Sequence, residues 1–109
     1  MTEKPWGFTE IVFANQFIEL HKITVKPKGF SSIHLHQNKS NIFSIIQGDL
    51  KVYTYSPEKV QNLDETNSCT EIKENTKHRF YSETGAIAYE IYYSREAKHL
   101  SINDIIRFS

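Results

Sequence analysis

The chain has 109 residues and a mass of 12.7 kDa, and its thirteen basic and thirteen acidic residues leave no net charge at neutral pH. This balance gives no electrostatic reason to bind nucleic acid or an anionic membrane, and the length suits a single domain over residues 1–109. Cys69 is the only cysteine, so no disulfide can form within the chain. Neither a signal peptide nor a membrane span is visible, and we expect a cytoplasmic protein.

In chain order, nearly every segment is predicted to form a β-strand. β-Branched and aromatic residues, often alternating with polar ones, indicate strands at residues 8–13, 17–25, 32–36, 42–46, 50–55, 70–73, 78–82 and 86–93. Turn-forming residues separate them, as at Gln47-Gly48-Asp49. The polar stretch 56–68 is expected to be a loop. Residues 101–108 are expected to form a short helix with Ser101 as its N-cap.

Many short strands joined by turns favour an all-β fold, either a sandwich or a small barrel, with at most one or two short helices. Closing the sheet removes the exposed edges that a small all-β chain must avoid. The mouth or interior of such a barrel is also a usual place for a ligand site.

Two histidines one residue apart are the strongest indication of chemistry. Because side chains alternate between the faces of a strand, His34 and His36 point the same way, while Ile33 and Leu35 point to the other face. Two imidazoles on one face are half of a metal site, and His78 is a third donor further along the chain. The sequence therefore predicts a metal site.

The histidines belong to a longer pattern: Gly29, His34, His36, Asn41, Gly48 and His78. This pattern resembles the two-motif signature of the cupin superfamily, in which two His and a Glu from the first motif and a His from the second bind a divalent metal. The resemblance implies the cupin fold, a double-stranded β-helix or jelly-roll barrel. It also implies a metal site of His34, His36, His78 and Asn41, which stands where the family usually carries Glu.

Four blocks narrow the resemblance to the cupin domain of type II phosphomannose isomerases (mannose-6-phosphate isomerase). They are residues 4–7 (KPWG), 23–27 (ITVKP), 74–80 (ENTKHRF) and 104–108 (DIIRF). The resemblance implies isomerisation of a sugar or sugar phosphate. It gives Arg107 and Lys39 catalytic roles beside that ligand, although both could equally face only solvent. It assigns no residues to a cofactor other than the metal, and it implies a homodimer.

The ligand set departs from the family, since the isomerases carry Gln in place of His34 and Glu in place of Asn41. Three neutral imidazoles leave a divalent ion with charge +2, which lowers the pKa of bound water and favours anionic ligands. Imidazole suits Zn, Fe, Ni, Cu or Mn. Three functions stay open: a sugar-phosphate isomerase, a three-His Fe(II) dioxygenase like some cupins, and a non-catalytic cupin that binds a sugar or another small molecule.

Several further residues carry weaker expectations. Trp6 is expected to be a core or dimer-contact residue. His21 and His99 fit no part of the pattern and are expected to be ordinary surface or partly buried residues. Glu90 and the tyrosine hydroxyls are candidates for the base that an isomerase needs, because the usual Glu is missing.

Overall fold

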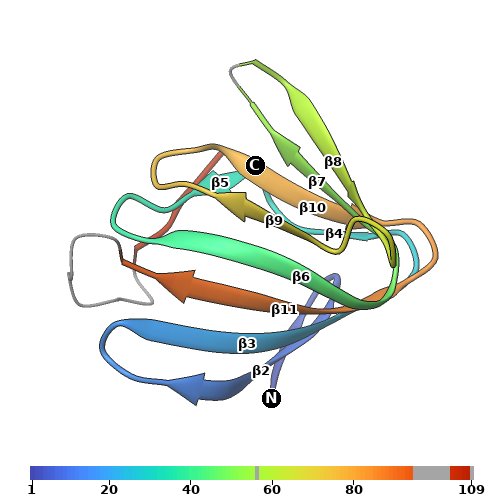
Figure 1. Ribbon diagram of the computed structural model, residues 1–109, viewed down its shortest axis with the longest axis horizontal. Helices are drawn as coiled ribbons and strands as arrows, with labels where there is room; N and C mark the ends of the chain where they lie inside the picture. Colours follow the sequence, from blue (N-terminus) through green and yellow to red (C-terminus); the bar gives the residue numbers. More distant parts are fainter. Residues whose placement is uncertain (56, 95–103, 109) are drawn as a thin grey trace.

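The computed structural model describes residues 1–55, 57–94 and 104–108. In these ranges the chain forms twelve β-strands and no helix, and the strands make two antiparallel sheets that face each other (Figure 1). None of the described residues lies in a helix of the length and apolar character that crossing a membrane requires. The expected all-β, jelly-roll type of barrel is confirmed.

The first sheet has the strand order β1 (Thr2–Lys4), β2 (Gly7–Ala14), β3 (Ile18–Val25), β11 (Ala86–Tyr93), β6 (Ser40–Gly48) and β9 (Cys69–Ile72). The second has the order β12 (Ile106–Arg107), β5 (His34–Leu35), β10 (His78–Ser82), β7 (Leu50–Thr54) and β8 (Lys59–Leu63), and β4 (Gly29–Phe30) pairs with β10. Neighbours in the sheets are often far apart in sequence, so residues from distant segments meet inside the barrel.

The core lies between the two sheets and follows from the alternation of apolar residues in the strands. In β7, Leu50 and Val52 are fully buried, whereas Lys51 and Tyr53, which alternate with them, are only partly buried. The same faces of the other strands complete a cluster of buried residues: Ile23, Val25, Phe43, Leu63, Ile72, Phe80, Ala86 and Ala88. Trp6 packs edge-on against Phe80 with ring centroids 4.9 Å apart, so the core part of its expected role is confirmed.

The predicted turn at Gln47-Gly48-Asp49 joins β6 to β7 and requires its glycine. Gly48 has a φ of 86°, in the left-handed region that L side chains rarely adopt. A Cβ at this position would lie 2.1 Å from the carbonyl oxygen of Gly85. A side chain at position 48 would therefore push apart the two turns that close this end of the barrel.

The expected loop at 56–68 is wrong in its centre, because β8 lies within it. Residues 59–63 pair with β7 in a regular register that sets Leu63 opposite Leu50. Only Leu63 is buried in this strand, and its other residues are exposed. An edge strand with one buried residue needs no alternating apolar pattern, which explains its polar sequence.

The expected helix at 101–108 is also wrong in the part that the structure describes. Residues 101–103 lie outside the described residues, but Ile106 and Arg107 form β12, opposite Leu35 and His34 of β5. The amide of Phe108 donates a hydrogen bond to the carbonyl of Ile33, which extends this pairing. Long-range strand pairing has overridden the local preference for a helix here.

Candidate metal centre

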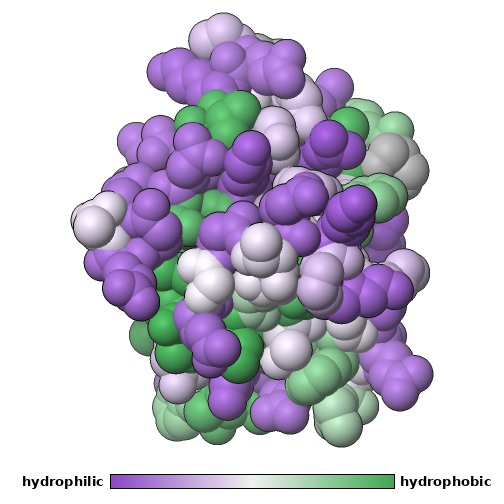
Figure 2. Space-filling model, turned by 90° about the vertical axis from the view of Figure 1, so that its right-hand side faces the viewer, coloured by the Kyte–Doolittle hydropathy of each residue, from purple (hydrophilic) through white to green (hydrophobic). Residues whose placement is uncertain are grey.

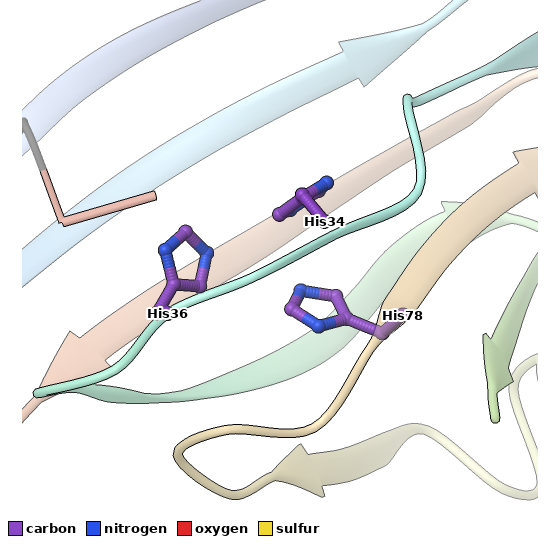
Figure 3. A group of neighbouring side chains, drawn as sticks. All are labelled: His34, His36 and His78. Atoms are coloured by element: carbon purple, nitrogen blue, oxygen red, sulfur yellow. The ribbon is translucent and has the colours of Figure 1, made fainter. Parts of the chain in front are cut away.

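The three predicted histidines meet inside the barrel, between strands that are distant in sequence (Figure 3). His34 lies in β5, His36 follows that strand directly, and His78 begins β10, where it pairs with His34. One nitrogen from each ring lies within 4.8 Å of a nitrogen of both others. All three side chains are buried. The strand expected at 32–36 is shorter than predicted, but the two side chains converge as the alternation required.

Hydrogen bonds fix the same tautomer in all three rings. The Nδ1 atoms of His34, His36 and His78 lie 2.8, 2.6 and 2.8 Å from backbone carbonyl oxygens, those of Ser32, Asp104 and Thr76. A carbonyl oxygen only accepts, so each Nδ1 carries the hydrogen and each Nε2 keeps its lone pair. Outer partners of this kind orient metal-binding imidazoles in proteins.

The Nε2 atoms are the ones that would bind an ion. Among the described residues, His36 and His78 have buried Nε2 atoms with no hydrogen-bond partner. A buried polar atom without a partner costs roughly 1–3 kcal/mol, so such atoms are rare in folded proteins. A divalent ion would satisfy these lone pairs, and the residues present therefore fit a metal. The hydrogen bonds at Nδ1, the burial of the three rings and the convergence of their nitrogen atoms all agree with a site of three imidazole ligands.

Burial also keeps the imidazoles neutral, which is the form that binds metal. Desolvation lowers the pKa of His36 from 6.5 to about 4 and that of His78 to about 3, and it lowers the pKa of His34 as well. The neighbouring rings add to the effect, since each protonated imidazole would repel the next. The site is therefore ready for a cation at neutral pH without first losing protons.

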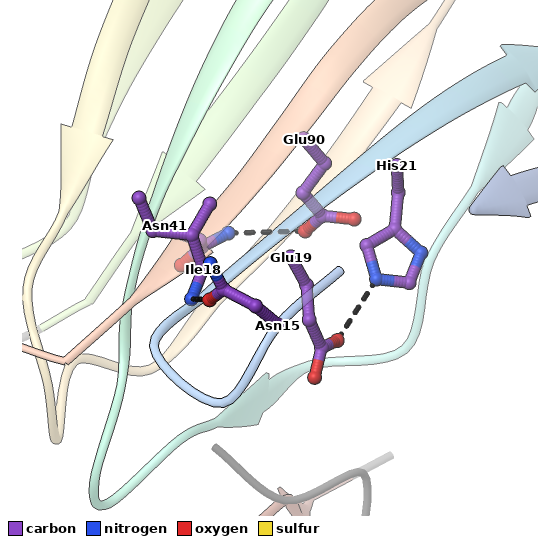
Figure 4. Close-up of polar contacts among 6 residues, drawn as sticks. All are labelled: Asn15, Ile18, Glu19, His21, Asn41 and Glu90. Carbon is purple, nitrogen blue, oxygen red and sulfur yellow. Dashed lines mark hydrogen bonds and ion pairs between the residues drawn. The ribbon is translucent and has the colours of Figure 1, made fainter. Parts of the chain in front are cut away.

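Asn41, the predicted fourth ligand, is buried and already has a partner. Its Nδ2 donates a hydrogen bond of 3.0 Å to Oε2 of Glu90, a buried carboxyl group on the neighbouring strand β11 (Figure 4). Desolvation raises the pKa of Glu90, while its bonds to Tyr92 and Asn41 act the other way. The amide at position 41 thus supports the carboxyl group of Glu90, which the sequence offered only as a candidate base.

A glutamate at position 41 would meet Glu90 at hydrogen-bond distance. We expect Asn41→Glu to destabilise the metal-free protein, because two buried carboxyl groups repel unless one is protonated. The double variant Asn41→Glu/Glu90→Gln removes that repulsion, and we expect it to bind metal more tightly than either Asn41→Glu or the wild type. Isothermal titration with Zn²⁺ measures all three proteins. Equal affinities in the double variant and the wild type would contradict this expectation.

Lys39 and Arg107 line the same cavity as His34 and His36, and the cavity has a volume of about 670 Å³. Lys39 is 5% exposed, and its Nζ lies 4.2 Å from the centroid of the Tyr92 ring. Burial lowers the pKa of Lys39, and the carboxylates of Glu19, Asp104 and Glu90 partly offset this. Arg107 is exposed on β12, opposite His34. Both predicted cations therefore face the space in front of the histidines.

Glu19 and His21 also line the cavity without any role expected from the sequence, beside Glu90 and Tyr92, which were only candidates for a base. Strand alternation could have found them. In β3, Ile23 and Val25 are core residues, so Glu19 and His21 must face the same side. In β11, Ala86 and Ala88 are core residues, so Glu90 and Tyr92 face the same side of the sheet as these alanines. His21 is partly buried, as expected, and it also lines the cavity, while His99 lies outside the described residues.

A family model described as "Mannose-6-phosphate isomerase C-terminal" matches residues 1–109, the whole chain. Xanthan biosynthesis protein XanB of Xanthomonas campestris pv. campestris is 28% identical over 105 residues in one strain and 27% in another. The match covers 96% of this chain and 22% of XanB, so the chain spans about a fifth of the length of these curated relatives.

Solved structures with the same fold are more distant in sequence. KdgF from Halomonas sp. superposes with a TM-score of 0.76 at 14% identity, over 87% of this chain and 86% of KdgF. A single-residue variant of Bacillus subtilis oxalate decarboxylase gives 0.82 at 14% identity, over 98% of this chain and 29% of that one. At these identities the likeness concerns the fold, a double-stranded β-helix of the cupin type.

Proposed function

Because the chain belongs to the mannose-6-phosphate isomerase C-terminal family of cupins, we propose that it is a metal-dependent isomerase of a sugar phosphate. The observation that carries the proposal is the group of three neutral imidazoles beside a cavity that also receives Lys39 and Arg107. A divalent ion held by His34, His36 and His78 would polarise a carbonyl and a neighbouring hydroxyl group.

The charges around the cavity support an anionic substrate. A divalent ion on three neutral ligands keeps its +2 charge, and Lys39 and Arg107 add two cations. Glu19 and Glu90 oppose them, although burial raises the pKa of Glu90 and so favours its neutral form. A phosphate is the anion for which a guanidinium offers matched pairs of donors. A phosphorylated sugar also fits within a cavity of about 670 Å³.

The test combines metal analysis with an activity assay. Purified protein is analysed for bound metals by mass spectrometry, then loaded in turn with Zn²⁺, Mn²⁺, Ni²⁺ and anaerobic Fe²⁺. Each form is incubated with mannose 6-phosphate, and the formation of fructose 6-phosphate is followed. The proposal expects turnover that a chelator abolishes and the metal restores. Absence of turnover in every loaded form would overturn it.

Arg107 gives a second expectation within this proposal. Arg107→Ala should raise KM for mannose 6-phosphate by roughly 10- to 100-fold, because a hydrogen bond to a charged group contributes about 1.5–3 kcal/mol. The same change should leave binding of unphosphorylated mannose unaltered, which serves as the control. Steady-state kinetics measure the first effect and calorimetry the second. Equal losses for both sugars would place Arg107 away from the phosphate.

The donor set favours a second candidate, a three-His Fe(II) dioxygenase. Within the described part of the chain, the group of residues that could hold an ion has three imidazoles and no carboxylate. Oxygen consumption by the Fe²⁺-loaded protein with small organic substrates distinguishes this function from isomerisation, which uses no oxygen.

We also propose that the protein forms a homodimer through the β2–β3 hairpin. Five large apolar side chains there are between 39% and 64% exposed: Ile11, Val12, Phe13, Phe17 and Ile18. The turn that joins β2 to β3 lies at the left of Figure 1, on the side away from the largely hydrophilic face drawn in Figure 2. A second copy would bury such a patch.

Light scattering is expected to give a dimer, and Phe13→Asp is expected to give a folded monomer. Val60→Asp, on the edge strand β8, is the matched control and should stay dimeric, since Val60 is similarly exposed but lies in the other sheet. A wild-type monomer at high micromolar concentration would contradict the homodimer.

A further inference from the structure

A histidine–carboxylate pair lies on the cavity wall formed by β3. His21 Nε2 and Glu19 Oε1 are 3.0 Å apart, and their side chains are only 14% and 12% exposed (Figure 4). A carboxylate only accepts, so Nε2 carries the hydrogen and Nδ1, on the side of the ring away from Glu19, keeps the lone pair. A carboxylate that fixes one tautomer of an imidazole is the usual support of a catalytic base.

The pair is separate from the three predicted metal ligands but close to them. The ring of Tyr92 packs edge-on against His21 and against His36, with centroids 5.3 Å apart in both cases. A single aromatic ring therefore separates His21 from the candidate metal centre. His21, His34 and His36 all line the one cavity, so a small sugar there could reach both groups.

Glu90, another carboxyl group that lines the cavity, is already hydrogen-bonded to neighbouring side chains. Glu90 is 7% exposed, accepts a hydrogen bond from Asn41 and shares one with the side chain of Tyr92. The carboxyl oxygen atoms of Glu90 are therefore engaged with Asn41 and Tyr92. His21, by contrast, bonds to Glu19 through Nε2, so its Nδ1 remains for a ligand in the cavity.

We propose that His21, oriented by Glu19, is the base that moves a proton between the two carbon atoms of the substrate during isomerisation. This inference rests on the proposed function. The imidazole lone pair takes the proton from C2, and the C2–H electron pair becomes the C1=C2 bond of an enediol as O1 gains a proton. The imidazolium, whose proton exchanges with solvent, then protonates C1, while O2 gives back to solvent a proton like the one that O1 gained from it, so the ketose has the atoms and electrons of the aldose. Glu19 is a positioning residue, because it acts through His21.

The test compares His21→Asn with the wild type, both loaded with the metal that supports turnover. We expect kcat to fall by roughly 10²- to 10⁴-fold, the usual contribution of a general base, with bound metal unchanged. Lys22→Gln is the matched control, because the next residue of β3 points to the opposite face of the sheet. In deuterated water, the wild-type product should carry deuterium at C1, because an exchangeable imidazole proton is returned there.

Glu19→Gln tests the positioning role, with Glu19→Asp as the conservative variant that keeps a carboxylate. An amide can donate to Nε2 as well as accept from it, so it no longer fixes the tautomer of His21, and kcat should fall while KM and bound metal stay unchanged. Glu19→Asp should recover part of the rate. A purely structural role would instead be met equally well by the near-isosteric Gln.

These experiments distinguish failure of the proposed isomerase function from failure of the role proposed for His21. A metal-loaded wild-type protein without turnover overturns the proposed function and this inference with it. An active wild type with an equally active His21→Asn variant overturns this inference alone. Loss of both metal and activity in His21→Asn also overturns it, because His21 would then serve the metal centre.

Discussion

Replacing His36 by Ala is expected to abolish metal binding under conditions in which the wild type is saturated. His36 supplies one of the three converging nitrogen atoms, and its Nε2 is buried without a partner among the described residues. Loss of an outer partner of a ligand already costs about 10- to 100-fold in affinity, so loss of the ligand itself should exceed about 100-fold. Calorimetric titration with Zn²⁺, backed by metal analysis of the purified variants, measures the effect.

His21→Ala is the matched control for this prediction. It removes the same ring from the same cavity, but His21 lies outside the group of three. Metal retained in both variants would show that the three histidines do not hold the ion. Circular dichroism of each variant at neutral pH checks that the β-structure persists, so that loss of metal is not read from unfolded protein.

The metal-free protein is expected to lose stability steeply as the pH falls below 6.5. The folded-state pKa of His36 is about 4 and that of His78 about 3, so the unfolded chain, with values near 6.5, binds more protons in this range. Stability from these groups is therefore complete above pH 6.5 and is lost as the pH falls toward their folded-state values. Each proton taken up on unfolding contributes a slope of about 1.4 kcal/mol per pH unit.

Glu90 acts in the opposite direction, because its raised pKa makes the folded state the better proton binder above 4.5. Three histidines, with His34 included, still outweigh one carboxyl group, so the net proton uptake on unfolding keeps the sign of the histidines, at about 1.4 kcal/mol per pH unit for each net proton. Urea unfolding of the metal-free protein between pH 7 and 4.5 measures this slope. His36→Gln should flatten it by about one proton and Glu90→Gln should steepen it. A flat profile in the wild type would contradict the neutral, buried state of the three rings.

The sequence could place His34 and His36 because their signal is local, and His78 because a resemblance covers the whole chain. The alternation of His34 and His36 fixes their common face, and the resemblance supplies His78 from a distant block. The register of β5 with β10 then brings His78 opposite His34. The long, regularly alternating strands β3, β7 and β11 were predictable for the same reason.

The rest depended on pairing that no local pattern records. β8 is a polar edge strand with one buried residue, and β12 is a two-residue strand defined only by its partner β5. The Asn41–Glu90 contact needs β6 and β11 side by side, although the two residues lie 49 positions apart in sequence. The pair Glu19–His21 needed only strand alternation, but it matches no metal motif and so carried no signal of its own.

The segment 104–108 links the candidate metal centre to the C-terminal end of the barrel. The carbonyl of Asp104 accepts from His36 Nδ1, and its carboxylate oxygens accept from the amides of Gln37 and Asn38 at 2.8 Å. Arg107 follows three residues later, opposite His34. A polyhistidine purification tag joined at this end would bring competing imidazoles next to the site. Metal stoichiometry and affinity are therefore best measured with the tag cleaved, or with a Strep-type tag that contributes no histidine cluster.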